Sequence, residues 1–241
     1  MKIGILQCGH ALAEVKAAHG DYAAMFRRLL DGHGFTFESH DAVDMDIPAD
    51  VHACDGWLLT GSPHGVYDDL PFIAPLEDFV RRAHAEGVPL VGICFGHQLI
   101  AQALGGKVEK FRKGWSVGSH RYHFEGVGEV SLNAWHQDQV VTPPPGAKTI
   151  ASSPFCAHAG LAYGDRALTF QAHPEFSNAV IADLIRLRRG TGTYPDDLMD
   201  AAQGHLSTLP DSPELGARIA AFFLSHDPAS HAPAEKARKH G

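Results

Sequence analysis

The sequence lacks the patterns that mark membrane and nucleic-acid-binding proteins. No apolar run approaches the ~20 residues that a membrane-spanning helix needs. The start, MKIGILQCGH, has a short apolar run without the small-residue cleavage site of a signal peptide. The 28 Asp and Glu outnumber the 20 Lys and Arg, and no basic block precedes the far C-terminus. We therefore predict a cytoplasmic protein with neither a nucleic acid nor a membrane as partner.

Metal-binding and cofactor-binding patterns are also missing. The cysteines form no Cys-x-x-Cys pair, which argues against both a zinc ribbon and a disulfide framework. The 17 histidines are scattered, and close pairs such as His120 and His123 lack the carboxylate or cysteine neighbours of a metal site. No Gly-x-x-x-x-Gly-Lys-Ser/Thr loop is present to hold a nucleotide phosphate. We expect no metal and no cofactor. The four cysteines are Cys8, Cys54, Cys94 and Cys156.

The first hundred residues alternate between strand and helix patterns. Short apolar runs are followed by amphipathic segments that end at glycine. This alternation predicts an α/β fold with a mostly parallel central sheet and helices on both faces. The expected strands are 2–7, 35–38, 55–60 and 88–93, and the expected helices are 21–31, 73–86 and 96–104.

The second half of the chain differs in character. Residues 107–172 form short segments separated by turn signals, such as Gly164-Asp165, which predicts a β-rich insertion. Helices are expected at 177–189, 195–203 and 212–225. The last residues are small, polar and charged, which favours disorder. We predict a domain over 1–190, a helical extension over 191–226 and a disordered tail over 227–241.

A reactive thiol stands at the sharpest corner of the chain. Gly92-Ile93-Cys94-Phe95-Gly96 fits the nucleophile-elbow pattern between a strand and a helix. The glycines let the two backbones approach, and the following helix directs its free N–H groups and positive dipole end at the sulfur, which favours the thiolate. A buried cysteine in a chance Gly-x-Cys-x-Gly remains the alternative for this segment alone.

A base and an orienting group are available downstream. In LTFQAHPEF a short strand is expected to end at His173, and in an extended segment Glu175 then shares a face with it. A carboxylate in that position can fix the tautomer of the imidazole while the other ring nitrogen faces the sulfur. Alone, His-x-Glu describes an exposed strand end equally well.

A Gly/Pro-shaped loop follows another buried strand at WLLTGSPHG. Acyl transfer needs backbone N–H groups aimed at the developing oxyanion, and such a loop beside the elbow can supply one. The N–H of Phe95, next after the nucleophile, can supply the other. Taken alone, Gly-Ser-Pro is only a turn.

Together, TGSP, GICFGHQ and QAHPE resemble the class I (triad) glutamine amidotransferase family, and the order Cys, His, Glu also fits it. The resemblance covers roughly residues 1–190. It implies a flavodoxin-like catalytic domain that releases ammonia from glutamine through a γ-glutamyl thioester. It also implies Cys94 as nucleophile, His173 as acid/base and Glu175 as its orienter.

The resemblance assigns further residues by position. The backbone N–H groups of Ser62 and Phe95 form the oxyanion hole. AWHQDQV, residues 134–140, matches the second substrate loop, where His-Gly-Asp or His-Ser-Leu is more usual; an ordinary turn with an aromatic anchor is its alternative. His64 departs from the Gly-Gly-Pro or Gly-Pro-Gly of many members and is expected to narrow the pocket or touch the far end of the substrate. The expected substrate contacts are Gly61, His64, Gln98, Trp135, Gln137 and Asp138.

The resemblance is strongest to the free-standing, GMP-synthase-like branch, which includes γ-glutamyl peptidases. About fifty residues follow 190, fewer than the ~100–200 of a typical synthetase domain. We therefore expect a free-standing cysteine hydrolase of a γ-glutamyl amide, either glutamine or a small conjugate. Two alternatives stay open: a glutaminase subunit that supplies ammonia to a separate synthetase chain, and a partner-binding relative without chemistry. A homodimer is also compatible with the sequence.

Overall fold

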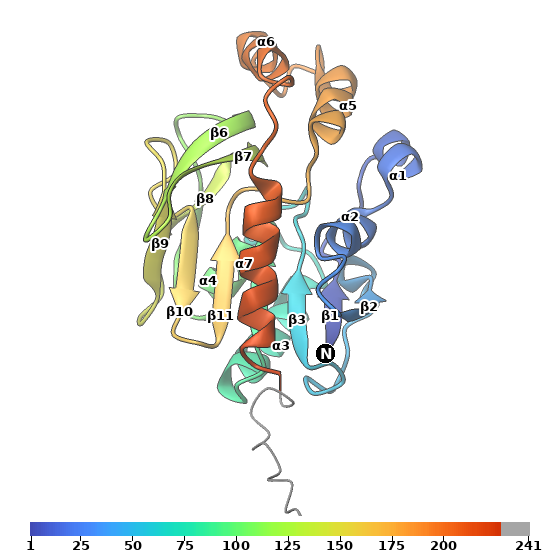
Figure 1. Cartoon of the computed structure of the whole chain (residues 1–241), viewed down its shortest axis with the longest axis vertical. Coiled ribbons are helices and arrows are strands. Elements are labelled where there is room, and N and C mark those ends of the chain that lie inside the picture. Colours follow the sequence, from blue (N-terminus) through green and yellow to red (C-terminus); the bar gives the residue numbers. More distant parts are fainter. Residues whose placement is uncertain (228–241) are drawn as a thin grey trace, which may run out of the picture.

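A computed structural model describes residues 1–227 (Figure 1). Its strands are β1 (Lys2–Leu6), β2 (Thr36–His40), β3 (Gly56–Leu59), β4 (Leu90–Ile93), β5 (Lys107–Lys110), β6 (Ser116–Phe124), β7 (Gly128–His136), β8 (Asp138–Thr142), β9 (Lys148–Ser152), β10 (Gly160–Tyr163) and β11 (Ala167–Phe170). Its α-helices are α1 (Ala13–His19), α2 (Tyr22–Leu29), α3 (Ile73–Ala85), α4 (Phe95–Ala103), α5 (Asn178–Arg188), α6 (Asp196–Gly204) and α7 (Ser212–Leu224), and a 3₁₀ turn, η1, spans Ala42–Asp44. Within this range no helix combines the length and apolarity needed to cross a bilayer.

The main sheet has a parallel half and an antiparallel half. Its strand order is β2-β1-β3-β4-β11-β10-β9-β6-β7. The first five strands are mutually parallel, and every later neighbour is antiparallel. The predicted α/β class is confirmed, and the β-rich section 107–172 supplies every strand of the antiparallel half. β5 and β8 pair separately. The order 2-1-3-4 places a topological switch between β1 and β3, where open α/β sheets bind ligands beyond the carboxyl ends of the strands.

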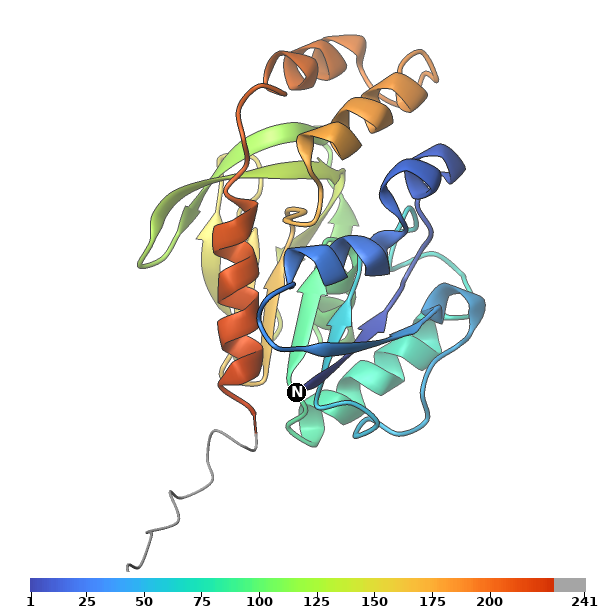
Figure 2. The same ribbon diagram turned by 45° about the vertical axis from the view of Figure 1, so that its right-hand side comes forward.

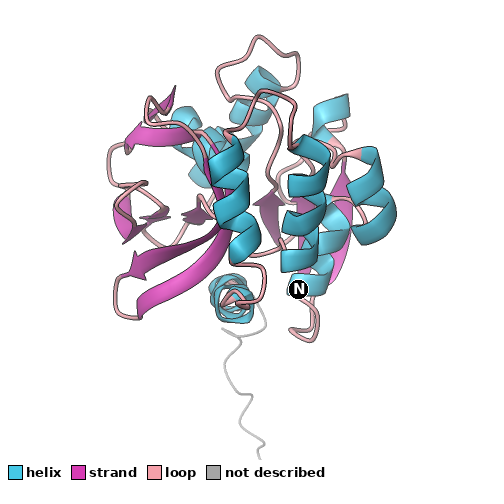
Figure 3. Cartoon of the chain, turned by 90° about the horizontal axis from the view of Figure 1, so that it is seen from above, coloured by secondary structure: helices cyan, strands magenta, loops and turns pink. Residues whose placement is uncertain are grey.

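Helices cover both faces of the parallel half. β3 and β4 are buried along their whole length, as strands with helices on both sides must be. Successive residues point to opposite faces, so Leu59 packs with α3 and α4, whereas Leu58 packs with α2 and α7. Figure 1 shows α2 and α7 in front of the strands, and the view from above in Figure 3 shows helices on both sides.

The last helix belongs to the core of the parallel sheet. The predicted helix 212–225 is confirmed as α7, and its buried residues Leu215, Ile219 and Phe223 share a cluster with Ile3 of β1. Phe223 lies so close to Gly56 that a Cβ there would stand 2.9 Å from its ring. The division at residue 190 stays a prediction, and the tail predicted over 227–241 lies, beyond Asp227, outside the described residues.

A third cluster caps the carboxyl ends of the parallel strands. Figure 2 shows α5 and α6 above these ends, with α1 beside α5. Val15 of α1, Ile181 of α5 and Met199 of α6 are buried in this cluster. α5 and α6 match predicted helices, but α1 was not predicted. It has seven residues, no side-chain cap at its start and a single buried residue, so its pattern is weak.

The corner between β4 and α4 leaves no room for side chains at its glycines. A Cβ on Gly96 would lie 2.4 Å from the carbonyl oxygen of Leu59, and one on Gly92 would lie 2.5 Å from the carbonyl oxygen of Gly96. Real Cβ atoms do not approach backbone atoms this closely, so any side chain here must push the strand and the helix apart.

We predict that Gly96→Ala destabilises the fold by ~1–3 kcal/mol, the usual cost of overpacking a filled core. Urea unfolding followed by circular dichroism measures this cost. Gly204→Ala is the matched control, because no atom lies within 4 Å of a Cβ there. It should leave stability unchanged or raise it by up to ~1 kcal/mol. Equal unfolding midpoints for Gly96→Ala and the unmodified chain would show that the corner is not tightly packed.

Candidate active site

Cys94 occupies the corner in a left-handed backbone conformation, with φ 52° and ψ −102°. A residue other than glycine pays of order 1–3 kcal/mol for such a conformation, which persists only where the surroundings impose it. Here, hydrogen bonds to the segments on both sides impose the conformation of Cys94. The Cys94 N–H donates to the carbonyl of Phe170 at 2.8 Å, and the Gly96 N–H donates to the carbonyl of Thr60 at 3.1 Å. The neighbouring strands β11 and β3 therefore hold the corner that presents the thiol.

His173 is fixed from three directions. Glu175 Oε1 lies 2.6 Å from His173 Nδ1, so a proton on this nitrogen is shared with the carboxylate. The imidazole stacks on Phe176 with the ring planes 5° apart and the centroids 4.1 Å apart. The His173 N–H donates to the carbonyl of Asn133 on β7 at 2.8 Å. Both His173 and Glu175 are buried, so these contacts are shielded from water.

The local backbone differs from the prediction in one respect. β11 ends at Phe170 rather than at His173, and His173 makes only an isolated bridge to Asn133. His173 and Glu175 therefore meet across a turn and not along an extended strand. The pairing itself is present, but its predicted geometric reason was wrong. Asn133 and Phe176 were missed; an asparagine between the apolar residues Leu132 and Ala134 was the available signal.

Gly61 lies against both His173 and Cys94. A Cβ on Gly61 would stand 2.8 Å from His173 Cε1 and 3.7 Å from Cys94 Cβ. The loop after β3, the corner after β4 and the turn after β11 thus converge at one point. The absence of a side chain at Gly61 gives the imidazole the space it occupies.

The electrostatic setting keeps His173 protonated. Burial alone lowers the pKa of a histidine, but the neighbouring Glu175 and then Cys94 outweigh it, so the pKa of His173 is raised above its ordinary value. A proton on His173 is thus retained to higher pH than on a free histidine. His136, also buried nearby, shows the opposite: burial and the charge of His173 lower its pKa to about 3.

Two backbone N–H groups flank Cys94 without protein acceptors among residues 1–227. α4 begins at Phe95 and has no capping side chain; the Gly96 N–H donates to the Thr60 carbonyl, whereas the Phe95 N–H has no acceptor. The Ser62 N–H likewise has no acceptor, and the Ser62 side chain accepts instead from the His64 N–H at 3.2 Å. These are the two groups predicted to stabilise an oxyanion.

A cavity of about 510 Å³ opens beside Cys94 and His173. Glu175 stands behind His173, and neither Gly61 nor Phe95 contributes to the wall. His64 reaches the cavity with its ring 6.1 Å from that of Phe72. The sequence-predicted residues that line the cavity are Ser62, His64, Cys94, Gln98, Trp135, Gln137, Asp138 and His173.

Two of the side chains predicted to contact substrate, Gln98 and Gln137, already donate hydrogen bonds to other groups of the protein. Gln98 Nε2 donates to the carbonyl of Asp138 at 2.8 Å and to Gln171 Oε1 at 3.1 Å. The amide of Gln137 donates to the carbonyl of Phe111 at 3.2 Å. Gln98 therefore holds the loop between β7 and β8 against α4.

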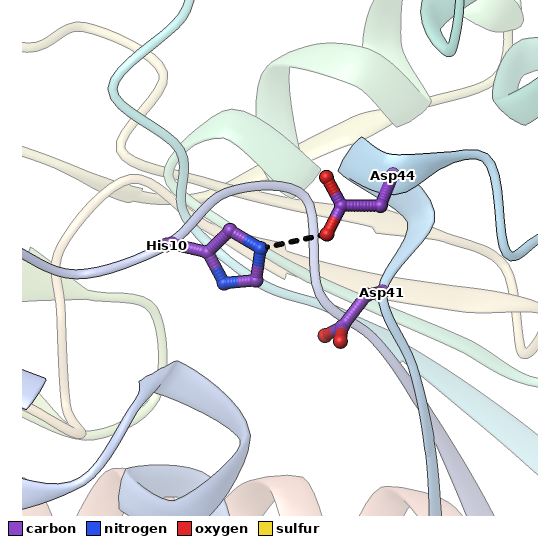
Figure 4. Close-up of side chains that lie close together, drawn as sticks. All are labelled: His10, Asp41 and Asp44. Carbon is purple, nitrogen blue, oxygen red and sulfur yellow. Dashed lines mark hydrogen bonds and ion pairs between the residues drawn. The ribbon is translucent and has the colours of Figure 1, made fainter.

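A second polar cluster lies at the rim of the cavity and was not predicted. His10, Asp41 and Asp44 have potential metal-ligating atoms within 4.8 Å of one another, and Figure 4 shows the His10 ring directed at Asp44. His10 contacts Asp44 through Nε2 at 3.0 Å and Asp21 through Nδ1 at 2.9 Å. Asp44 and then Asp21 raise the pKa of His10, which favours the charged form of the ring. Asp41 instead accepts from Gln7 Nε2 at 2.7 Å, so hydrogen bonds and ion pairs within the protein already engage all three side chains.

We predict that Glu175→Gln lowers the pKa of His173, because the carboxylate that favours its charged form is removed. Titration of the imidazole ¹⁵N resonances measures the pKa, with His173→Ala identifying the signal. Glu129→Gln is the control: it removes an exposed carboxylate 3.2 Å from His123 and should leave His173 unchanged. An identical His173 titration in the Glu175→Gln variant would contradict the electrostatic assignment.

Comparison with known proteins agrees with this architecture. The model of the family "Glutamine amidotransferase class-I" matches residues 28–183. A glutamine amidotransferase-like protein of Schizosaccharomyces pombe is 30% identical, over 92% of this chain and 98% of that protein. Gamma-glutamyl peptidase 4 of Arabidopsis thaliana is 28% identical, over 89% and 91%. The crystal structure of a glutamine amidotransferase from Methylobacillus flagellatus shares the fold, with a TM-score of 0.68, 22% identity and 94% of each chain covered. The chain belongs to the class I glutamine amidotransferase family.

Proposed function

We propose that this chain hydrolyses a γ-glutamyl amide through a γ-glutamyl thioester on Cys94. The observation that carries the proposal is the 2.6 Å contact between Glu175 and His173 beside a cysteine at a strained strand–helix corner. A thiol nucleophile needs a base to take and return a proton, and the base needs a group that orients it. Cys94, His173 and Glu175 have these roles.

The reaction proceeds in two balanced steps. The Cys94 sulfur, having given its proton to His173, attacks the γ-carbonyl carbon, and the C–N bond breaks as His173 returns that proton to the departing amine. Water then attacks the thioester, His173 accepts one proton from it, and the C–S bond breaks to give glutamate and free Cys94. The raised pKa of His173 suits the first step, because the imidazolium is the form that protonates the amine.

The oxyanion and the substrate are assigned to the groups around the corner. The free N–H groups of Ser62 and Phe95 stabilise the oxyanion of each tetrahedral intermediate. The loop between β7 and β8, which Gln98 holds in place, contacts the amino-acid end of the γ-glutamyl group. The residues proposed to contact or make room for substrate are Gly61, His64, Gln98, Trp135, Gln137 and Asp138.

Among the other histidines that line the cavity, His136 feels the charge of His173, and it is a poor base. Its Nδ1 donates to the carbonyl of Asp138 at 3.2 Å, and its pKa of about 3 leaves its free nitrogen weakly basic. The other cysteines are equally unsuited to nucleophilic attack. Burial raises the pKa of both Cys8 and Cys156 to about 12 and that of Cys54 to about 11.

We favour hydrolysis by a free-standing chain over the supply of ammonia to a separate synthetase chain. The gamma-glutamyl peptidase from Arabidopsis matches this chain along 91% of its own length, so the two have similar extents. As its name states, that protein is a peptidase of γ-glutamyl peptides, whose hydrolysis needs no ammonia acceptor. A glutaminase subunit would require a separate synthetase chain, and a partner-binding relative would require no triad.

We predict that the purified chain alone releases amine or ammonia from at least one γ-glutamyl amide. Glutamine, γ-glutamyl dipeptides and glutathione form the test panel, read out by mass spectrometry of the products. Cys94→Ala should abolish turnover, whereas Cys156→Ala, which alters a buried thiol away from the cavity wall, should retain it. Turnover that appears only after a second protein is added would support the glutaminase-subunit alternative. Full activity of Cys94→Ala would refute the proposal.

We also predict that His173→Ala loses ~10³-fold or more in kcat, as members of catalytic triads do. Glu175→Gln should lose less, because Glu175 orients the imidazole without accepting the proton. Since the pKa of His173 is raised, kcat/KM should decline only at alkaline pH, and in Glu175→Gln this decline should move to lower pH. His123→Ala, an exposed histidine, is the control. Near-normal kcat in His173→Ala would transfer the base role elsewhere.

A further inference from the structure

The cavity is larger than glutamine requires. Pockets of ~300–1,000 Å³ hold drug-sized ligands, and the cavity of about 510 Å³ falls within that range, whereas glutamine has only about ten non-hydrogen atoms. In the proposed reaction His173 protonates the departing amine, so the leaving group lies on the His173 side. The surplus space on that side is bounded by α5.

One face of α5 forms a continuous wall that starts at His173. Phe176 stacks on His173, and Val180, Leu184 and Arg188 follow at intervals of four residues, all lining the cavity. Residues four apart lie on the same side of a helix. α5 rises ~12 Å from Val180 to Arg188. Helical side chains lean back towards the N-terminus, which brings the Arg188 guanidinium nearer to His173.

Aromatic rings stand at the far end of this wall. Tyr194 lies with its ring centroid 4.5 Å from that of Trp115 and 5.3 Å from that of Trp135. All three are partly exposed and line the cavity. Such a group offers flat apolar surface to a ligand at low entropic cost, because aromatic side chains have few rotatable bonds.

Arg188 is the unpaired member of a basic run. Arg186 pairs with Asp183, and Arg189 pairs with Asp200 and Gln203. Within residues 1–227 the half-buried Arg188 side chain has neither a hydrogen bond nor an ion pair, and it faces the cavity. A guanidinium presents a planar fork of donors that fits a carboxylate. Arg188 and Tyr194 lie outside residues 28–183, the segment that the family model matches, whereas Phe176 and Val180 lie within it.

We propose that Trp115, Trp135, Leu184, Arg188 and Tyr194 form a distal subsite for the leaving group. Resting on the proposed function, this subsite selects γ-glutamyl peptides whose departing part carries an apolar or aromatic side chain and a free carboxylate. The carboxylate pairs with Arg188, and the side chain packs on the rings. An extended dipeptide spans about 7 Å, which is shorter than the ~12 Å rise of α5 between Val180 and Arg188.

The test compares γ-glutamyl-phenylalanine with its C-terminal amide, which lacks only the charge. The unmodified chain should prefer the free acid in kcat/KM by roughly 10- to 100-fold, the ratio that a charge-assisted hydrogen bond supplies. Arg188→Gln should remove most of this preference and bring the ratio close to one, because the lost ion pair supplies the same roughly 10- to 100-fold. Arg188→Lys should restore part of it. Arg189→Gln, whose arginine is paired outside the cavity, is the matched control and should retain the full preference.

The outcomes separate the subsite from the reaction. An active enzyme with equal kcat/KM for the acid and the amide, or with a preference that Arg188→Gln leaves intact, overturns the subsite and leaves the proposed hydrolysis standing. Absence of turnover on every γ-glutamyl amide overturns both. Tyr194→Ala gives a second measure. It should lower kcat/KM for γ-glutamyl-phenylalanine more than for γ-glutamyl-glycine, and equal losses for both would contradict packing of the side chain on the rings.

Discussion

The backbone of Cys94 is held in a conformation that it would not adopt alone, and the arrangement of the site depends on that restraint. With φ at 52°, the residue turns the chain from β4 into α4 within a single step. Hydrogen bonds from Cys94 to β11 and from Gly96 to the end of β3 fix the turn, and glycines at 92 and 96 give it space. The cost of the strained residue is offset by two parallel strands that are buried on both faces.

The same parallel strands deliver the remaining groups. The loop after β3 brings Gly61 and Ser62, and the turn after β11 brings His173 and Glu175 to the same edge of the sheet. β7 of the antiparallel half contributes Asn133, which receives a backbone hydrogen bond from His173. Residues from both the parallel and the antiparallel half of the sheet therefore position His173. Above this edge, α5 lines the cavity with Val180, Leu184 and Arg188, and Tyr194 lines it from the segment between α5 and α6.

Patterns that are local in sequence predicted most of this structure. Apolar runs and helical periodicities located the parallel strands and their covering helices, and Gly-x-Cys-x-Gly located the corner. The pairing of His173 with Glu175 was predicted, although it occurs across a turn. Features that depend on contacts between distant segments could not be predicted. The ring of Phe176 under His173, the bond from Gln98 to the Asp138 carbonyl and the approach of Tyr194 to Trp115 exist only once the chain has folded.

The most direct test of the account is to capture the covalent intermediate. The protein should be acid-quenched during turnover of a γ-glutamyl peptide, digested and analysed by tandem mass spectrometry. The account predicts a γ-glutamyl group on the peptide that contains Cys94, at higher occupancy in a variant in which the attack of water is slowed. A γ-glutamyl adduct on Cys8, Cys54 or Cys156, or steady hydrolysis with Cys94 unmodified at every quench time, would contradict it.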